Sequence, residues 1–176
     1  MRFALSRRLP GMLVLAAIIG AGALLFGGRQ DGAARTAEGV RVTIIDGDSL
    51  RAGAEMIRLV SIDAPELTQT CRDGEAREWA CGRAAKERLT ALAAAGEVSC
   101  RRQGRDRYGR TLAVCAAGGV ADLGEALVRE GYAVDYSRTD GGYLAAEDEA
   151  RAARRGLWRG AFERPQDWRR RHPRAG

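Results

Sequence analysis

Residues 58–66 read RLVSIDAPE, an apolar strand that contains one arginine and two carboxylates. Burying an unpaired charge is costly, so Arg58 needs either a carboxylate partner or a bound ligand. A structural ion pair between Arg58 and Asp63 remains open beside a ligand site. The two residues are five positions apart, so a regular strand would send them to opposite faces. A shared ligand therefore requires the strand to bend or end before Asp63, and Pro65 favours an early end.

The patterns on both sides of this stretch predict an α+β domain. An Asp-Gly turn separates two short β-branched segments, and apolar residues at helical spacing follow the central strand. The expected strands are 41–45, 49–52, 56–62, 97–102 and 111–116, and the expected helices are 79–95, 123–130 and 143–155, with 132–136 extended. Five strands in a chain of this length favour a small closed barrel, of which the OB-fold is one form. Other α+β arrangements fit the same element order.

The N-terminus predicts export. Twenty residues without a charge, Leu9 to Gly28, follow an arginine-rich start and are long enough to cross a membrane as a helix. We expect residues 1–28 to be a signal peptide or a membrane anchor, which sends the rest of the chain out of the cytoplasm. The protein would then be secreted, or held by the membrane at the periplasmic face of the inner membrane. Residues 29–40 are Gly/Ala-rich and are predicted to be a linker before the domain at 41–163.

The charge is unevenly distributed along the chain. The net charge is +6, of which residues 1–35 contribute +4 and residues 164–176 contribute +4, so the segment 36–163 carries −2. Overall basicity is therefore poor evidence that the domain itself binds nucleic acid. Residues 164–176 are predicted to be a basic, solvated tail. We expect a monomer.

Four cysteines, Cys71, Cys81, Cys100 and Cys115, agree with export, because disulfides persist in oxidising compartments. A structural zinc site is disfavoured, since no closely spaced cysteine pair exists and the one histidine lies in the tail. Three connectivities are possible. Proximity in sequence favours Cys71–Cys81 and Cys100–Cys115, and four buried free thiols remain the alternative.

Two further charged clusters flank the central stretch. Residues 46–49 read DGDS and residues 105–110 read RDRYGR. Taken singly, the first is typical of a hairpin turn and the second of a solvated turn. Their significance lies in their combination with residues 58–66.

Together these clusters resemble the thermonuclease (staphylococcal nuclease) family. The matching segments are DGD at 46–48, RLVSIDAPE at 58–66, DRYGR at 106–110, GEALVREG at 124–131 and GLW at 156–158, so the resemblance covers about residues 41–160. Separated motifs in the right order are a stronger signal than any one of them. The resemblance implies an OB-type five-stranded barrel with three helices, calcium dependence, and hydrolysis of phosphodiester bonds in DNA or RNA.

The resemblance also implies roles for individual residues. Asp48 and Asp63 would be the carboxylate ligands of calcium, and Ala64 would add its backbone carbonyl. Calcium is a hard cation that takes oxygen ligands, which suits this set. Arg58 and Arg110 would hold the scissile phosphate, because a guanidinium group offers a planar fork that stays ionised.

Glu66 would orient or deprotonate the attacking water, and it is the one nearby candidate base because no histidine is available. Arg107 and Tyr108 match positions that contact the nucleotide. The alternative is a non-catalytic OB-type module that binds nucleic acid or an envelope protein. A module that has lost catalysis is expected to lack Arg58, Glu66 or Arg110, and this chain retains all three. The sequence therefore favours an enzyme.

Overall fold

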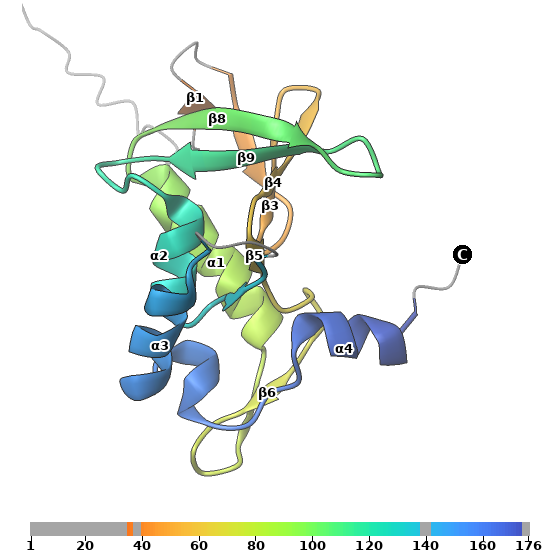
Figure 1. Ribbon diagram of the computed structural model, residues 1–176, viewed down its shortest axis with the longest axis vertical. Helices are drawn as coiled ribbons and strands as arrows, with labels where there is room; N and C mark the ends of the chain where they lie inside the picture. Colours follow the sequence, from red (N-terminus) through yellow and green to blue (C-terminus); the bar gives the residue numbers. More distant parts are fainter. Residues whose placement is uncertain (1–34, 37–39, 138–141, 174–176) are drawn as a thin grey trace, which may run out of the picture. The chain divides into compact units, whose positions relative to one another are not determined.

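A computed structural model describes residues 35–36, 40–137 and 142–173, and Figure 1 shows their arrangement. The predicted signal peptide or anchor at 1–28 lies outside the described residues. Within the described part, no helix is long and apolar enough to cross a membrane. The elements in chain order are β1 Arg35–Thr36, β2 Val42–Ile44, β3 Ser49–Ala52, β4 Glu55–Leu59, β5 Ile62–Asp63, β6 Cys71–Arg72, β7 Glu78–Trp79, α1 Cys81–Ala94, β8 Glu97–Arg105, β9 Thr111–Ala116, α2 Leu123–Arg129, β10 Val134–Asp135, α3 Leu144–Ala152, the 3-10 helix η1 Gly156–Arg159, and α4 Pro165–Arg171.

The main sheet is mixed, with strand order β1-β8-β9-β4-β3-β2. Its five longer strands are those predicted from the sequence, and β3 and β9 have the predicted bounds. The strands β2, β3 and β4 form an antiparallel meander, β4 runs parallel to β9, and β8 pairs antiparallel with β9. Alternate residues of β9 are buried, so one face of the sheet covers the core.

The expected closed barrel is not found among the described residues. The strands β1 and β2 stand at opposite ends of the strand order, and no pairing joins them there. After β4, Ser61 adopts a left-handed conformation with φ of 61°. The chain then leaves the main sheet, and β5 pairs with β10 in a separate two-stranded sheet. The α+β class is confirmed, but the sheet remains open.

The three predicted helices are present as α1, α2 and α3. The residues of α1 that were expected to face inward, among them Ala85, Leu89 and Ala93, are buried in the core. Asp122 caps α2 by accepting hydrogen bonds from the backbone N–H groups of Gly124 and Glu125. These two helices pack against each other and cover the buried side of the sheet.

Two predictions about the ends of the domain need correction. The tail is not simply a solvated extension, because Pro165–Arg171 forms a fourth helix, α4. Proline at the first helical position and Asp167 in the first turn favour helix formation there. In the predicted linker, Arg35 and Thr36 pair in parallel with β8 as strand β1. Most of the other linker residues lie outside the described part.

Both predicted disulfides, Cys71–Cys81 and Cys100–Cys115, are present, and no cysteine is free. The first closes the loop that holds the β6–β7 hairpin, and its cysteines pack with Leu157 in a small second core. The second joins directly opposed residues of β8 and β9. The alternative of four free thiols is therefore wrong.

Candidate active site

Arg58 joins the two predicted metal ligands. Its Nη1 donates a hydrogen bond to Asp48 Oδ1 at 2.6 Å, and its Nη2 donates to Asp63 Oδ1 at 3.2 Å. The early end of β4 makes this possible, because the left-handed residue Ser61 reverses the expected alternation before Asp63. The conflict between strand periodicity and a shared site is thus resolved by a break in the strand, as the sequence required.

Asp48 is positioned by the close approach of its turn to the segment that contains Ala64. A Cβ on the preceding Gly47 would lie 2.7 Å from the Ala64 side chain, so glycine lets the turn reach the strand. Asp48 Oδ2 then accepts the Ala64 backbone N–H at 3.2 Å, and Oδ1 also accepts the Ser49 hydroxyl at 2.8 Å. Ala64 therefore contacts the site through its backbone, which makes its side chain dispensable there.

Burial dominates the electrostatics of the pair of aspartates. Asp48 is 4% exposed and Asp63 is 1% exposed. Burial raises the pKa of the Asp48 carboxyl to about 7, although the Arg58 guanidinium opposes that shift. Burial alone would lower the pKa of Arg58, but the two carboxylates outweigh it and raise the pKa above its ordinary value. The cluster is therefore two buried carboxyl groups that contact one guanidinium.

Glu66 is placed by two residues that sequence reasoning missed. Gln69, which is fully buried, accepts the Glu66 backbone N–H through Oε1 at 3.2 Å. Gly82, in the first turn of α1, leaves room for the Glu66 backbone, since a Cβ there would lie 1.8 Å from the Glu66 carbonyl oxygen. The side chain of Glu66 accepts a hydrogen bond from Arg169 Nη1 at 3.0 Å.

Arg169 is the third missed residue, and it comes from α4. Its guanidinium donates to both oxygens of Asp63, each at 2.9 Å. Asp63 and Glu66 are therefore linked through one arginine from the C-terminal helix. In the sequence, Pro165 is typical of the start of a helix, but it does not indicate where that helix docks.

The predicted phosphate- and nucleotide-contacting residues lie on the turn between β8 and β9. Arg110 Nε donates to Asp106 Oδ2 at 2.7 Å, and this bond, together with backbone N–H donors, counters desolvation and holds the pKa of Asp106 below its usual value. Tyr108 is 69% exposed, with the Arg107 guanidinium 4.8 Å from its ring centroid. This turn is an exposed, basic and aromatic surface.

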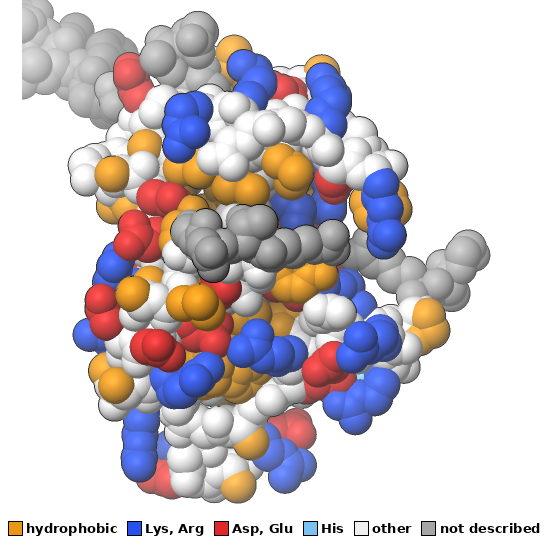
Figure 2. Space-filling view, in the orientation of Figure 1, with side chains coloured by type: hydrophobic (Ala, Val, Ile, Leu, Met, Phe, Trp, Pro, Cys, Tyr) orange, Lys and Arg blue, Asp and Glu red, His pale blue; other side chains and the backbone are white. Residues whose placement is uncertain are grey.

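The structure brings Arg58, Asp48, Asp63, Ala64 and Glu66 together around the ends of β3, β4 and β5. The register connects the hairpin turn to this group, because Thr111, which follows Arg110, pairs with Ile57, which precedes Arg58. In the face shown in Figure 2, basic side chains stand along the end of the sheet that carries β8 and β9, and around α4.

The donor set suits calcium in chemical type. Asp48 and Asp63 offer carboxylate oxygens, and a single guanidinium contacts both, so the two groups face a common point. Across residues 35–36, 40–137 and 142–173, no group of three acidic, histidine or cysteine side chains is arranged to hold a metal. A cation here would therefore need water or substrate oxygens to complete its coordination.

The mixed sheet and the cluster of carboxylates and arginines at the break after β4 define an α+β domain with a largely buried charged site. The chain belongs to the family described as staphylococcal nuclease homologues, whose model matches residues 56–160. This match includes Arg58, Glu66 and Arg110. It ends before α4, so Arg169 lies outside the matched segment.

Three relatives illustrate the similarity. Succinoglycan biosynthesis protein ExoI of Rhizobium meliloti (strain 1021) is 35% identical over 121 residues, which are 68% of this chain and 63% of that protein. A micrococcal nuclease of Shigella flexneri is 35% identical over 146 residues, covering 73% of this chain and 78% of the other. An uncharacterized endonuclease of Escherichia coli O157:H7 is 34% identical over 123 residues, covering 66% and 74%. The chain thus spans less than two thirds of the Rhizobium protein.

Proposed function

We propose that the domain is a calcium-dependent nuclease that hydrolyses phosphodiester bonds in DNA or RNA. The observation that carries the proposal is the contact of Arg58 with two buried carboxylates, beside Glu66. The Arg58 guanidinium and the candidate base Glu66 lie beside two carboxylates whose oxygens suit a hard cation. Phosphoryl transfer needs this combination, because it depends on positioning and on neutralising charge rather than on covalent chemistry by the protein.

Two arginines would stabilise the reacting phosphate. The oxygens of the phosphate gain negative charge in the transition state, and a guanidinium fork donates to two oxygens at once. Arg58 already presents both of its terminal nitrogens to oxygen acceptors. Arg110 would exchange its bond to Asp106 for the substrate, bringing a second fork from the β8–β9 turn.

Glu66 would act on the nucleophile. An attacking water forms a bond to phosphorus and gives its proton to the Glu66 carboxylate, while the bond from phosphorus to the leaving oxygen breaks. Glu66 is partly exposed, so water reaches it. Its backbone contacts to Gln69 and to the first turn of α1 hold it in position.

Calcium held by Asp48, Asp63 and the carbonyl of Ala64 would neutralise charge on the phosphate. Arg107 and Tyr108 would contact the neighbouring nucleotide, because an exposed ring stacks on any base and an arginine beside it contacts the backbone. The presence of Arg58, Glu66 and Arg110 favours this proposal over a binding module without catalysis.

Removing calcium is expected to abolish cleavage. The full chain, purified in a mild non-ionic detergent, should cut single-stranded DNA with millimolar calcium and lose that activity in excess chelator, because Asp48 and Asp63 then lack their cation. Gel analysis of a labelled oligonucleotide measures both states, and calcium added back after chelation is the control. Equal cleavage in chelator would remove the calcium assignment.

We also propose that the protein acts outside the cytoplasm. The two disulfides support this proposal, because such bonds persist in oxidising compartments. When cells that produce the full chain are fractionated, we expect the protein in the membrane, periplasmic or extracellular fraction. Its cysteines should not react with alkylating reagents, because they are disulfide-bonded. Recovery wholly in the cytoplasmic fraction with reactive thiols would contradict the proposal.

A further inference from the structure

Arg169 occupies the carboxylates that the proposed nuclease needs. It reaches them from α4, more than a hundred residues along the chain from Asp63. Both oxygens of Asp63 and one oxygen of Glu66 accept hydrogen bonds from its guanidinium, at 2.9, 2.9 and 3.0 Å. The proposed metal ligand and the proposed base are thus held by the same side chain.

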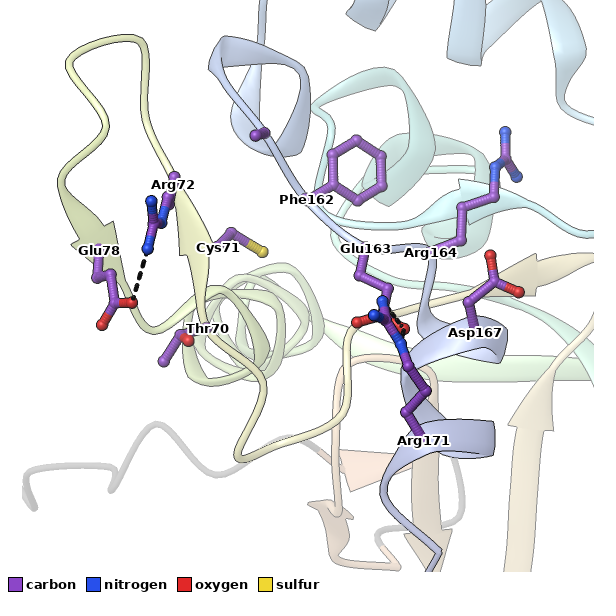
Figure 3. A pocket seen from close by; sticks show the side chains of 10 residues that line it. Thr70, Cys71, Arg72, Glu78, Phe162, Glu163, Arg164, Asp167 and Arg171 are labelled. Atoms are coloured by element: carbon purple, nitrogen blue, oxygen red, sulfur yellow. Dashed lines mark hydrogen bonds and ion pairs between the residues drawn. The ribbon is translucent and has the colours of Figure 1, made fainter.

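The helix that carries Arg169 is firmly placed. Gln69 Nε2 donates to the Glu163 carbonyl at 2.7 Å, while the other end of the same amide holds the Glu66 backbone. Arg171 Nε bonds Glu163 Oε1 at 2.6 Å, and the Arg72 backbone N–H donates to the Ala161 carbonyl at 2.8 Å. Figure 3 shows the pocket between the β6–β7 hairpin and α4, with Arg171 turned toward Glu163. One buried glutamine therefore ties the loop of Glu66 to the segment that leads into α4.

The charges make Arg169 and a divalent cation alternatives. Arg169 contacts both oxygens of Asp63, and Arg58 contacts one of them, so two guanidinium charges already adjoin this carboxylate. A divalent cation bound to Asp63 with both arginines in place would lie beside two like charges and would compete for oxygens that already accept hydrogen bonds. Arg169 therefore has to leave Asp63 when the cation binds.

We infer that Arg169 is an internal countercharge that holds the site closed until calcium displaces it. This inference rests on the proposed function and names its regulation. In the closed state Arg169 satisfies the carboxylates that burial would otherwise leave unpaired, and it also engages Glu66. Calcium binding then has to overcome the Arg169 contacts, so the apparent affinity for calcium is lower than the intrinsic affinity of the two aspartates. Release of Arg169 frees Asp63 for the cation and Glu66 for water.

Calcium binding to the full chain tests the inference without measuring activity. Isothermal titration calorimetry with calcium chloride is run on chelator-treated wild type, Arg169→Gln and Arg170→Gln, in the same detergent. Arg170 is the matched control, because it lies on the same helix and its ion pair among the described residues is a local one, with Asp167. We expect Arg169→Gln to bind calcium about tenfold more tightly or better, within the usual range of coupling between two sites, and Arg170→Gln to match wild type.

Hydrogen–deuterium exchange gives an independent readout. Calcium should speed exchange of the backbone amides of residues 166–171 in wild type, because Arg169 releases Asp63, and should change that exchange little in Arg169→Gln. Circular dichroism verifies that each variant is folded, and Arg169→Lys serves as a second variant that keeps the charge but loses the fork. Lysine is expected to give an intermediate affinity.

The outcomes distinguish a failure of the role inferred for Arg169 from a failure of the proposed calcium dependence. Wild type that binds calcium while Arg169→Gln binds equally or more weakly would overturn the role of Arg169 and leave the nuclease proposal standing. No calcium binding by either protein would withdraw the calcium assignment, and the competition with it. Binding by Arg169→Gln alone, or more tightly than by wild type, supports the inference.

Discussion

Replacing Arg58 by lysine is expected to lower kcat for cleavage of single-stranded DNA by about 10³, the lower end of what phosphate-binding arginines contribute in phosphoryl transfer. Lysine keeps a positive charge between Asp48 and Asp63, so the fold should persist. It loses the planar fork that donates to two acceptors at once. Steady-state cleavage rates with saturating calcium measure the effect.

The matched control is Arg51→Lys, on the neighbouring strand β3, where the arginine is exposed. That variant should keep the activity of wild type. A second variant, Arg58→Ala, should also lower the free energy of unfolding by about 3–5 kcal/mol, because it leaves the buried Asp48 without its guanidinium partner. Thermal unfolding followed by circular dichroism measures that loss. Full activity in Arg58→Lys would exclude Arg58 from the reaction.

Local sequence patterns predicted the parts of this fold that depend on local interactions. The strand predicted at 111–116 has the bounds of β9, and the Asp-Gly turn marked the start of β3. Arg58 and Asp63 are five positions apart, so a shared site also required a break in the strand between them. The left-handed residue that produces it, Ser61, carries no sequence signal, because serine rarely adopts that conformation.

Closure of the sheet could not be predicted in the same way. It depends on whether two strands far apart in sequence meet at their edges, and hydrophobic periodicity within each strand says nothing about that. After Ser61 the chain pairs with β10 instead of extending the main sheet. The five longer strands were therefore predictable, whereas the edge strand β1, the short strands outside the main sheet and the open form of that sheet were not.

The candidate site was predicted as far as its motifs reach. Arg58 was singled out because a charge in an apolar strand needs a partner, whereas Asp48 and Glu66 received their roles from the family resemblance. Gln69 and Arg169 were missed for opposite reasons: the first lies in a polar loop, and the second in a run of arginines that is typical of a solvated tail. Their burial and docking depend on tertiary contacts, such as that of Arg169 with Asp63, which local sequence patterns do not encode.

Replacing Glu66 by glutamine is expected to lower kcat by about 10²–10⁴, the contribution of a positioned general base. Glutamine keeps the size of the side chain and can still accept a hydrogen bond from Arg169, but it takes no proton from water at neutral pH. The KM for single-stranded DNA should change little, because Arg58 and the β8–β9 turn remain. The control is Glu78→Gln, an exposed glutamate on β7.

Steady-state cleavage rates with saturating calcium measure the effect of Glu66→Gln. A kcat within twofold of wild type in Glu66→Gln would remove Glu66 from the mechanism. In that case Arg169 would hold a structural carboxylate, and its release would matter for Asp63 alone.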